Sequence, residues 1–272
     1  MLAKVNSILQ LPRSILLPIG ITGQQVDLFS GLVSRELKLL YKRSKLGMAW
    51  TLIKPLMQLA VFYLVFGTFL STDIPNFASF LFTGLIAWTW FQSALTEATK
   101  SLVVNETLLK QPGFPPAVLP LVSIASGCIH FLLSLPVLLT FLWMENVKFN
   151  MAVFALPLVM FVQIVFTAGL AYLTASFNVV FRDVQHTLVV VLQMLFYLSG
   201  IFYTKDLVPT SYQIYFQLNP MVHIIAAYRA IFIEGNWPDW SNLILIGVLS
   251  FLLCLIGYRL FRRQSVRFVD EL

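Results

Sequence analysis

The chain has 272 residues, of which 58% are hydrophobic and 11% are charged, and its net charge is +6 at pH 7. Soluble domains are about 25% charged, so this composition excludes an ordinary soluble domain and indicates a protein that mostly faces lipid. The basic residues are spread between long apolar runs. This distribution excludes the concentrated basic patch of a nucleic-acid-binding domain, and no nucleic-acid partner is expected.

Residues 24–46 have the periodicity of an amphipathic helix. Their apolar residues recur at helical spacings and form one stripe, and basic residues complement it. The basic residues are Arg35, Lys38, Lys42, Arg43 and Lys45. This pattern predicts a helix that lies in the membrane interface rather than across it. Two interpretations stay open: a simple lipid anchor, or an anchor that also docks a cytoplasmic partner.

Six later stretches are apolar and long enough to cross a hydrocarbon core of about 30 Å. They lie at about residues 51–71, 78–96, 118–143, 151–181, 184–204 and 241–258. We therefore predict an all-α polytopic membrane protein with six transmembrane helices. With no room for a soluble module, residues 1–272 are expected to form a single transmembrane domain.

The distribution of Lys and Arg predicts the orientation of these spans. Threading six spans places all of these basic residues on one side except Lys148, Lys205 and Arg229. Loops rich in Lys and Arg stay in the cytoplasm during insertion. Both termini are therefore predicted to be cytoplasmic.

Two internal connections are candidates for contact with a peripheral subunit. A short polar helix is predicted at about residues 99–111, because Gln111-Pro112-Gly113 ends it. The other connection is a tight turn between the fourth and fifth spans. The candidate coupling residues are Thr99, Asn105, Glu106, Leu109, Lys110, Arg182 and Asp183. A plain structural connector remains the alternative.

The region before the last span predicts a broken helix. Residues 207–228 carry no charge, but their polar side chains would cost several kcal/mol in lipid. A seventh span would also move the basic C-terminal tail to the outside, against the orientation rule. We therefore predict a re-entrant hairpin at about residues 207–234, on the outer side and broken at Asn219-Pro220.

The chain lacks the motifs of common enzymes. It contains no GxxxxGK[ST], HExxH, CxxC or GxSxG sequence, so neither ATP hydrolysis nor a metal or catalytic site is expected in it. Mid-span carboxylates and inverted repeats, typical of secondary transporters, are not visible. An integral-membrane transferase acting on lipid-linked sugars is the alternative function. His130, near a span centre, is either a packing residue or a substrate or proton site.

Aromatic residues are plentiful in three spans and form either a lipid-facing belt or a pore wall. Aromatic faces offer sugar rings an apolar contact without a deep energetic trap, which suits a polymer that slides. We place the first and fifth spans at the pore. The candidate pore residues are Phe62, Tyr63, Phe66, Phe69, Trp88, Phe196 and Tyr197.

Three segments occur in an order and at a spacing that resemble a known family. The first surrounds Gly47, Trp50 and Pro55, the second is Arg182-Asp183, and the third contains Asn219-Pro220. Together they resemble the polysaccharide and polyol-phosphate exporters, which are membrane subunits of ATP-binding-cassette (ABC) transporters for O-antigen, capsule and teichoic acid. One departure is Lys54, where the family more often has Asn.

The resemblance implies a homodimer in the bacterial cytoplasmic (inner) membrane, with two copies of a separate ABC ATPase that binds ATP and Mg²⁺. No cofactor is expected in this chain. The implied cargo is a lipid-diphosphate-linked glycan, O-antigen above all, moving through a pore at the dimer axis. Candidate headgroup-binding residues are Arg35, Lys42 and Arg43 on the inner side and Arg229 on the outer side. Anchoring by the basic cluster and an Arg229–Glu234 ion pair are the alternatives.

Overall fold

The computed structural model describes residues 23–40, 44, 46–70, 73–148 and 150–271. Across these residues the chain is helical and contains no strand, so the predicted all-α fold is confirmed. The helices are α3 (Gly23–Leu40), α4 (Trp50–Phe62), α5 (Phe77–Val104), α6 (Glu106–Leu109), α7 (Val118–Met144), α8 (Leu156–Val180), α9 (Val184–Leu198), α10 (Gln213–Gln217), α11 (Pro220–Arg229), α12 (Trp240–Gln264) and α13 (Phe268–Glu271). Two π-helical turns, η3 (Tyr63–Phe69) and η7 (Ala230–Glu234), continue α4 and α11.

Four helical stretches are long and apolar enough to cross a membrane. They are Trp50–Phe69, Val118–Met144, Met151–Val180 and Trp240–Arg267, which coincide with four of the predicted spans. The second predicted span lies in α5, which has 28 residues and is therefore about 42 Å long. Its Trp, Thr, Ser and Gln residues make α5 less apolar than the four long stretches listed above. The chain is thus a multi-pass membrane protein, and the count of six spans stays a prediction.

Helix α5 forms the centre of the molecule. It packs against α7, α8, α4 and α11, and residues such as Leu81 and Ala98 have no exposed surface. Two buried polar side chains beside it are hydrogen-bonded: Gln163 of α8 donates to the Ala87 carbonyl oxygen at 2.9 Å, and Tyr228 of α11 donates to Gln163 Oε1 at 2.8 Å. Because an unpaired polar group is costly in a membrane, these bonds fix how α5, α8 and α11 meet.

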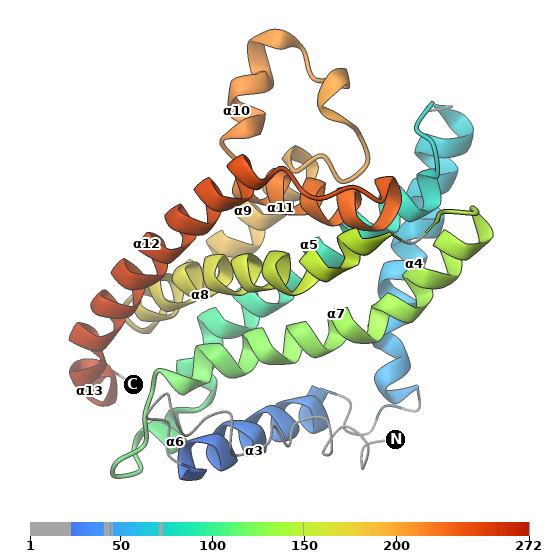
Figure 1. Ribbon diagram of the computed structural model, residues 1–272. Helices are drawn as coiled ribbons and strands as arrows, with labels where there is room; N and C mark the ends of the chain where they lie inside the picture. Colours follow the sequence, from blue (N-terminus) through green and yellow to red (C-terminus); the bar gives the residue numbers. More distant parts are fainter. Residues whose placement is uncertain (1–22, 41–43, 45, 71–72, 149, 272) are drawn as a thin grey trace.

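Helices α8 and α12 lie side by side and approach closely at two glycines (Figure 1). A Cβ atom added to Gly257 would lie 2.5 Å from the Gly169 carbonyl oxygen. Such an approach is possible only without side chains, as in other membrane helix pairs that meet at small residues. Many apolar residues on the remaining surface of α12, including Phe251, are exposed, as expected for contact with lipid.

Helix α3 lies at one end of the molecule near α6, and α10 lies at the opposite end (Figure 1). Following the predicted orientation, we call these the inner and outer ends. Val33 and Leu37 of α3 are buried against Val122 of α7, so the predicted apolar stripe of residues 24–46 is confirmed for the part that forms α3. We call α3 the interface helix. It ends at Leu40, and Ser44 and Leu46 are not helical, so the predicted extension to residue 46 is wrong; residues 41–43 and 45 lie outside the described residues.

Two further boundaries predicted from the sequence are wrong. The predicted helix 99–111 is not continuous, because α5 runs to Val104 and only Glu106–Leu109 form the separate helix α6. The predicted fifth span, 184–204, is also too long. Helix α9 ends at Leu198, and Gly200 just beyond it has a φ of +64°, the left-handed conformation that glycine supplies at helix ends.

Candidate functional site

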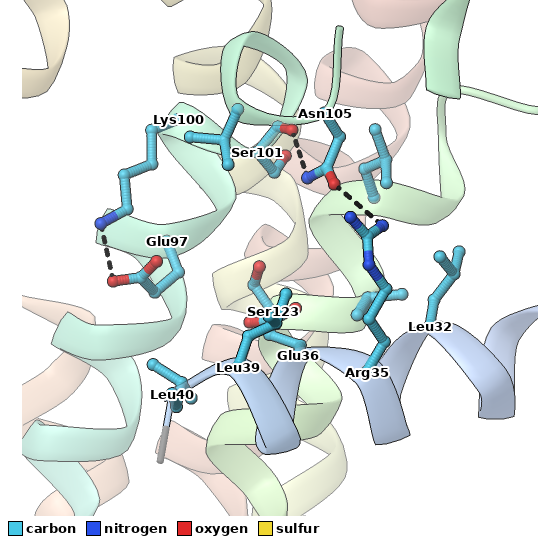
Figure 2. Close-up of a pocket in the computed structure, with 13 residues that line it drawn as sticks. Leu32, Arg35, Glu36, Leu39, Leu40, Glu97, Lys100, Ser101, Asn105 and Ser123 are labelled. Atoms are coloured by element: carbon cyan, nitrogen blue, oxygen red, sulfur yellow. Dashed lines mark hydrogen bonds and ion pairs between the residues drawn. The ribbon is translucent and has the colours of Figure 1, made fainter. Parts of the chain in front are cut away.

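The inner end contains a groove between the interface helix, α5 and α7, with a volume of about 340 Å³ (Figure 2). Arg35 of the interface helix donates from Nη1 to Asn105 Oδ1 at 3.5 Å. Asn105 stands at the break between α5 and α6 and donates from Nδ2 to the Ser101 carbonyl oxygen at 2.9 Å. These bonds connect the interface helix to the joint at which the predicted coupling segment turns.

Glu36 points from the interface helix into the same groove, near Ser123 (Figure 2). Burial raises the pKa of Glu36 to about 7, and the nearby negative charge of Glu97 adds to the shift. Glu97 itself pairs with Lys100 at 2.9 Å. Glu36 was not among the predicted site residues, although an acid directly before Leu37 of the apolar stripe is a signal that could have identified it.

The seven candidate coupling residues divide into buried and accessible groups. Thr99 is fully buried and its Oγ1 donates to Thr174 Oγ1 at 2.7 Å, which ties α5 to α8. Leu109 is also buried. Lys110, Arg182 and Asp183 are exposed, and they form the part of the set that is open to a partner.

The structure brings the two predicted internal connections together. Glu106 forms an ion pair with Lys110, and the pKa of Glu106 is lowered first by this bond and further by the positive charge of Arg182. The C-terminal helix α13 also packs against α6. The inner surface near α6 therefore combines three segments that are far apart in the sequence.

The residues around the start of α4 form a turn. Gly47 has a φ of +52°, and its N–H donates to Ser44 Oγ at 3.1 Å. Trp50 and Lys54 are exposed at the inner end of α4, whereas Pro55 is buried inside this helix. The structure thus gives Gly47 and Pro55 local structural functions and leaves Trp50 accessible.

The predicted break at Asn219-Pro220 is confirmed as the start of α11. Asn219 Oδ1 accepts from the Met221 N–H at 3.0 Å, which is the bond of a helix N-cap, and Pro220 occupies the first helical turn. Asn219 Nδ2 also donates to Ser199 Oγ at 2.9 Å. This side chain therefore joins the end of α9 to the start of α11, while the depth of the hairpin in the membrane stays a prediction.

The aromatic residues of the first and fifth predicted spans meet. The rings of Phe62 and Phe196 are 5.8 Å apart, and the rings of Phe66 and Phe202 stack at 4.8 Å. Ring pairs at these distances stabilise the contact between α4 and the α9 region. The two spans that were placed at the pore are therefore neighbours in the structure, and the pore itself stays a prediction.

Not all of the candidate pore residues face outward. Tyr63, Phe69 and Tyr197 are 46%, 71% and 49% exposed, so they lie on the free face of η3 and α9, which we call the η3–α9 aromatic face. Trp88 and Phe196 are buried behind that face, with ring centres 6.0 Å apart. Only about a tenth of the Trp50–Phe69 stretch is buried, the lowest share among the four long apolar stretches.

Arg229 is 9% exposed and lies between α11, α5 and the segment after α9. Its Nε, Nη1 and Nη2 donate to the carbonyl oxygens of Phe80, Gly200 and Ile201 at 3.3, 2.8 and 2.6 Å. The guanidinium also lies 3.4 Å from the centre of the Phe80 ring. This geometry gives Arg229 a structural function, and its contact with a headgroup stays a prediction. Lys42 and Arg43 lie outside the described residues.

Comparison with known proteins identifies the family. Residues 27–233 match the family described as ABC-2 type transporter. The chain belongs to this family. It is therefore a transmembrane subunit of an ABC transporter rather than an enzyme, and ATP hydrolysis takes place in a separate subunit.

Several curated relatives match the chain over nearly its whole length. An O-antigen export system permease protein RfbA of Myxococcus xanthus is 31% identical over 92% of this chain and 96% of the relative. A protein of the same name from Klebsiella pneumoniae is 30% identical over the same shares. The polysialic acid transport protein KpsM of Escherichia coli is 22% identical over 90% of this chain and 96% of its own length.

Proposed function

We propose that this chain is the transmembrane half of an exporter that moves a lipid-linked polysaccharide of the O-antigen type across the cytoplasmic membrane. The observation that carries this proposal is the likeness to two O-antigen export permeases at 30–31% identity over 92% of the chain. The capsule-type relative is less similar, at 22% identity. The transferase alternative has no relative among these matches in its favour.

The exposed η3–α9 aromatic face supports a pore at a homodimer axis. A protomer that exposes Tyr63, Phe69 and Tyr197 beside apolar residues leaves a large apolar surface without a protein partner. In a membrane protein such a face contacts either lipid or another protein, and its aromatic rings suit a channel because they offer sugar rings an apolar contact surface. A second copy of the chain would cover part of this face and enclose the rest as a channel for sugar rings.

The inner groove supports a route for coupling. The partner ATPase binds ATP and Mg²⁺ and contacts the surface formed by α6, Arg182 and Asp183. Movement of α6 passes through Asn105 to Arg35 and so to the interface helix. Because the interface helix also lies against α7, the motion reaches the spans. Arg35, with Lys42 and Arg43, attracts the diphosphate headgroup at the inner leaflet.

The proposal is tested by genetic complementation in the source bacterium. Deletion of the gene should abolish the O-antigen that is detected on the surface of whole cells. The lipid-linked glycan should accumulate inside the cells instead. Complementation should require both this chain and an active partner ATPase, and an ATPase with its Walker-A Lys replaced should not rescue. Normal surface O-antigen in the deletion strain, or loss of glycan synthesis instead of glycan export, would contradict the proposal.

A further inference from the structure

The outer end contains a cavity of about 590 Å³ between the segment after α9, α10, α11 and the start of α12. This volume lies within the 300–1,000 Å³ typical of small-molecule sites. The cavity uses none of the residues of the inner groove or of the η3–α9 aromatic face. We call it the outer cavity.

Aromatic rings form part of the wall of the outer cavity. Tyr203 and Phe216 line it with ring centres 5.8 Å apart. Phe216 lies against Gly200, where an added Cβ would come within 2.8 Å of the ring, so this position of Phe216 depends on glycine. Trp237, from the segment between η7 and α12, also lines the cavity and is 53% exposed. These rings offer apolar faces to a ligand.

Polar groups accompany the rings. His223 Nε2 is 2.7 Å from the Gln217 carbonyl oxygen, which fixes the imidazole at the wall. The Asp239 carboxylate caps α12 through the Ser241 and Asn242 N–H groups, and it also accepts from Asn242 Nδ2 at 2.7 Å. Side-chain amides and carboxylates in fixed positions are suitable partners for hydroxyl groups.

The charges of the lining are balanced. Lys205 and Arg229 are basic, whereas Glu234 and Asp239 are acidic. The three guanidinium nitrogens of Arg229 already donate to backbone carbonyls, so little of this positive charge is offered to a ligand. A diphosphate or an acidic sugar would meet two carboxylates here. The lining therefore favours an uncharged ligand that carries hydroxyls and has an apolar ring face.

We propose that the outer cavity is a binding subsite for a short uncharged stretch of the exported glycan, on the side where the polymer emerges. The inference rests on the proposed function, because a sugar polymer is the ligand that this transporter would bring to the outer end. Transient binding of the emerged sugars in this cavity opposes backward sliding of the polymer between cycles of ATP hydrolysis.

The test measures binding by the complete transporter, purified with its ATPase in lipid nanodiscs. The probe is the host's O-polysaccharide, released from lipid by mild acid and fractionated to two or three repeat units, and affinity is measured by calorimetry. We compare Trp237→Ala with Trp240→Ala. The two rings are neighbours, 5.9 Å apart, and both are exposed, but only Trp237 lines the cavity.

We expect the unmodified transporter and the Trp240→Ala variant to bind the probe equally, and the Trp237→Ala variant to bind roughly tenfold more weakly, as for loss of an aromatic residue that contacts the ligand. Equal affinities for the two variants, or no binding by the unmodified transporter, would overturn the subsite. In either of those cases export that still depends on the chain and its ATPase would leave the proposed function intact.

Discussion

Replacement of Arg229 distinguishes a structural function from headgroup binding. Each hydrogen bond with a charged donor contributes about 1.5–3 kcal/mol, and Arg229 makes three of them to carbonyl oxygens. Relaxation of the surrounding structure and entry of water offset part of the free energy lost with these hydrogen bonds. We expect Arg229→Ala to lower the free energy of unfolding by about 3–5 kcal/mol, comparable to breaking a buried ionic network. This is a large fraction of a total that is typically about 5–15 kcal/mol.

Arg229→Lys sharpens the test because it keeps the charge. A single ammonium group cannot reproduce the fork that reaches Phe80, Gly200 and Ile201 together, so we expect about half of the loss seen with alanine. Stability is followed as the melting temperature of the purified protein in detergent. Arg182→Ala, at an exposed position, is the control and should melt like the unmodified protein.

The reasoning about Arg229 would be refuted by one combination of results. If Arg229→Ala melted at the temperature of the unmodified protein and was inserted normally, yet export was lost, the side chain would act on the cargo and not on the fold. Restoration of export by Arg229→Lys without a change in melting temperature would support the same conclusion.

Three further predictions follow from single positions. Gly257→Ala should cost about 1–3 kcal/mol of stability, because its Cβ would meet the Gly169 carbonyl oxygen at 2.5 Å. Gly247→Ala on the same helix is the control and should be nearly neutral, since the nearest contact of its Cβ would be at 3.6 Å. Equal melting temperatures for the two variants would contradict this prediction. The pKa of Glu36 is about 7 in the folded protein and about 4.5 for an ordinary carboxyl group, so the folded state binds the proton more tightly. As the pH rises from about 4.5 to 7, the unfolded chain loses this proton first, and the contribution of Glu36 to stability falls. Glu36→Gln should therefore melt above the unmodified protein at pH 8 and close to it at pH 5, and a pH-independent difference would contradict the burial argument. Asn219→Ala should lower stability by about 1 kcal/mol through loss of the N-cap, measured by the same melting assay, and a variant as stable as the unmodified protein would show that the cap is dispensable.

The sequence predicted the features that depend on hydropathy and on backbone chemistry. Long apolar runs specify membrane helices because lipid leaves few other ways to satisfy backbone hydrogen bonds. The break before Pro220 was predictable for a similarly local reason, since the proline has no N–H to donate and Asn219 is a good N-cap residue. The interface helix was predictable because Val33 and Leu37 belong to a periodic stripe.

The features that depend on tertiary contacts were not predictable in this way. Thr99 looks like part of a polar cytoplasmic helix in the sequence, but its hydroxyl bonds to Thr174 and α5 continues past it. Arg229 looks like a free cation, but three carbonyl oxygens from distant segments surround it. Trp88 looks like a candidate pore residue, yet Phe196 covers it. Each depends on partners at least 28 residues away in the sequence, or on which face of a helix is covered.

We propose that this chain forms a passive conduit that a separate ATPase drives. The most direct measurement uses proteoliposomes containing the chain with its partner ATPase, loaded with fluorescently labelled lipid-linked O-antigen on the side of the nucleotide-binding subunits. The account predicts that the labelled glycan appears on the far side only when both proteins and ATP are present. Translocation by this chain alone, or chemical change of the lipid-linked sugar in its presence, would contradict the account.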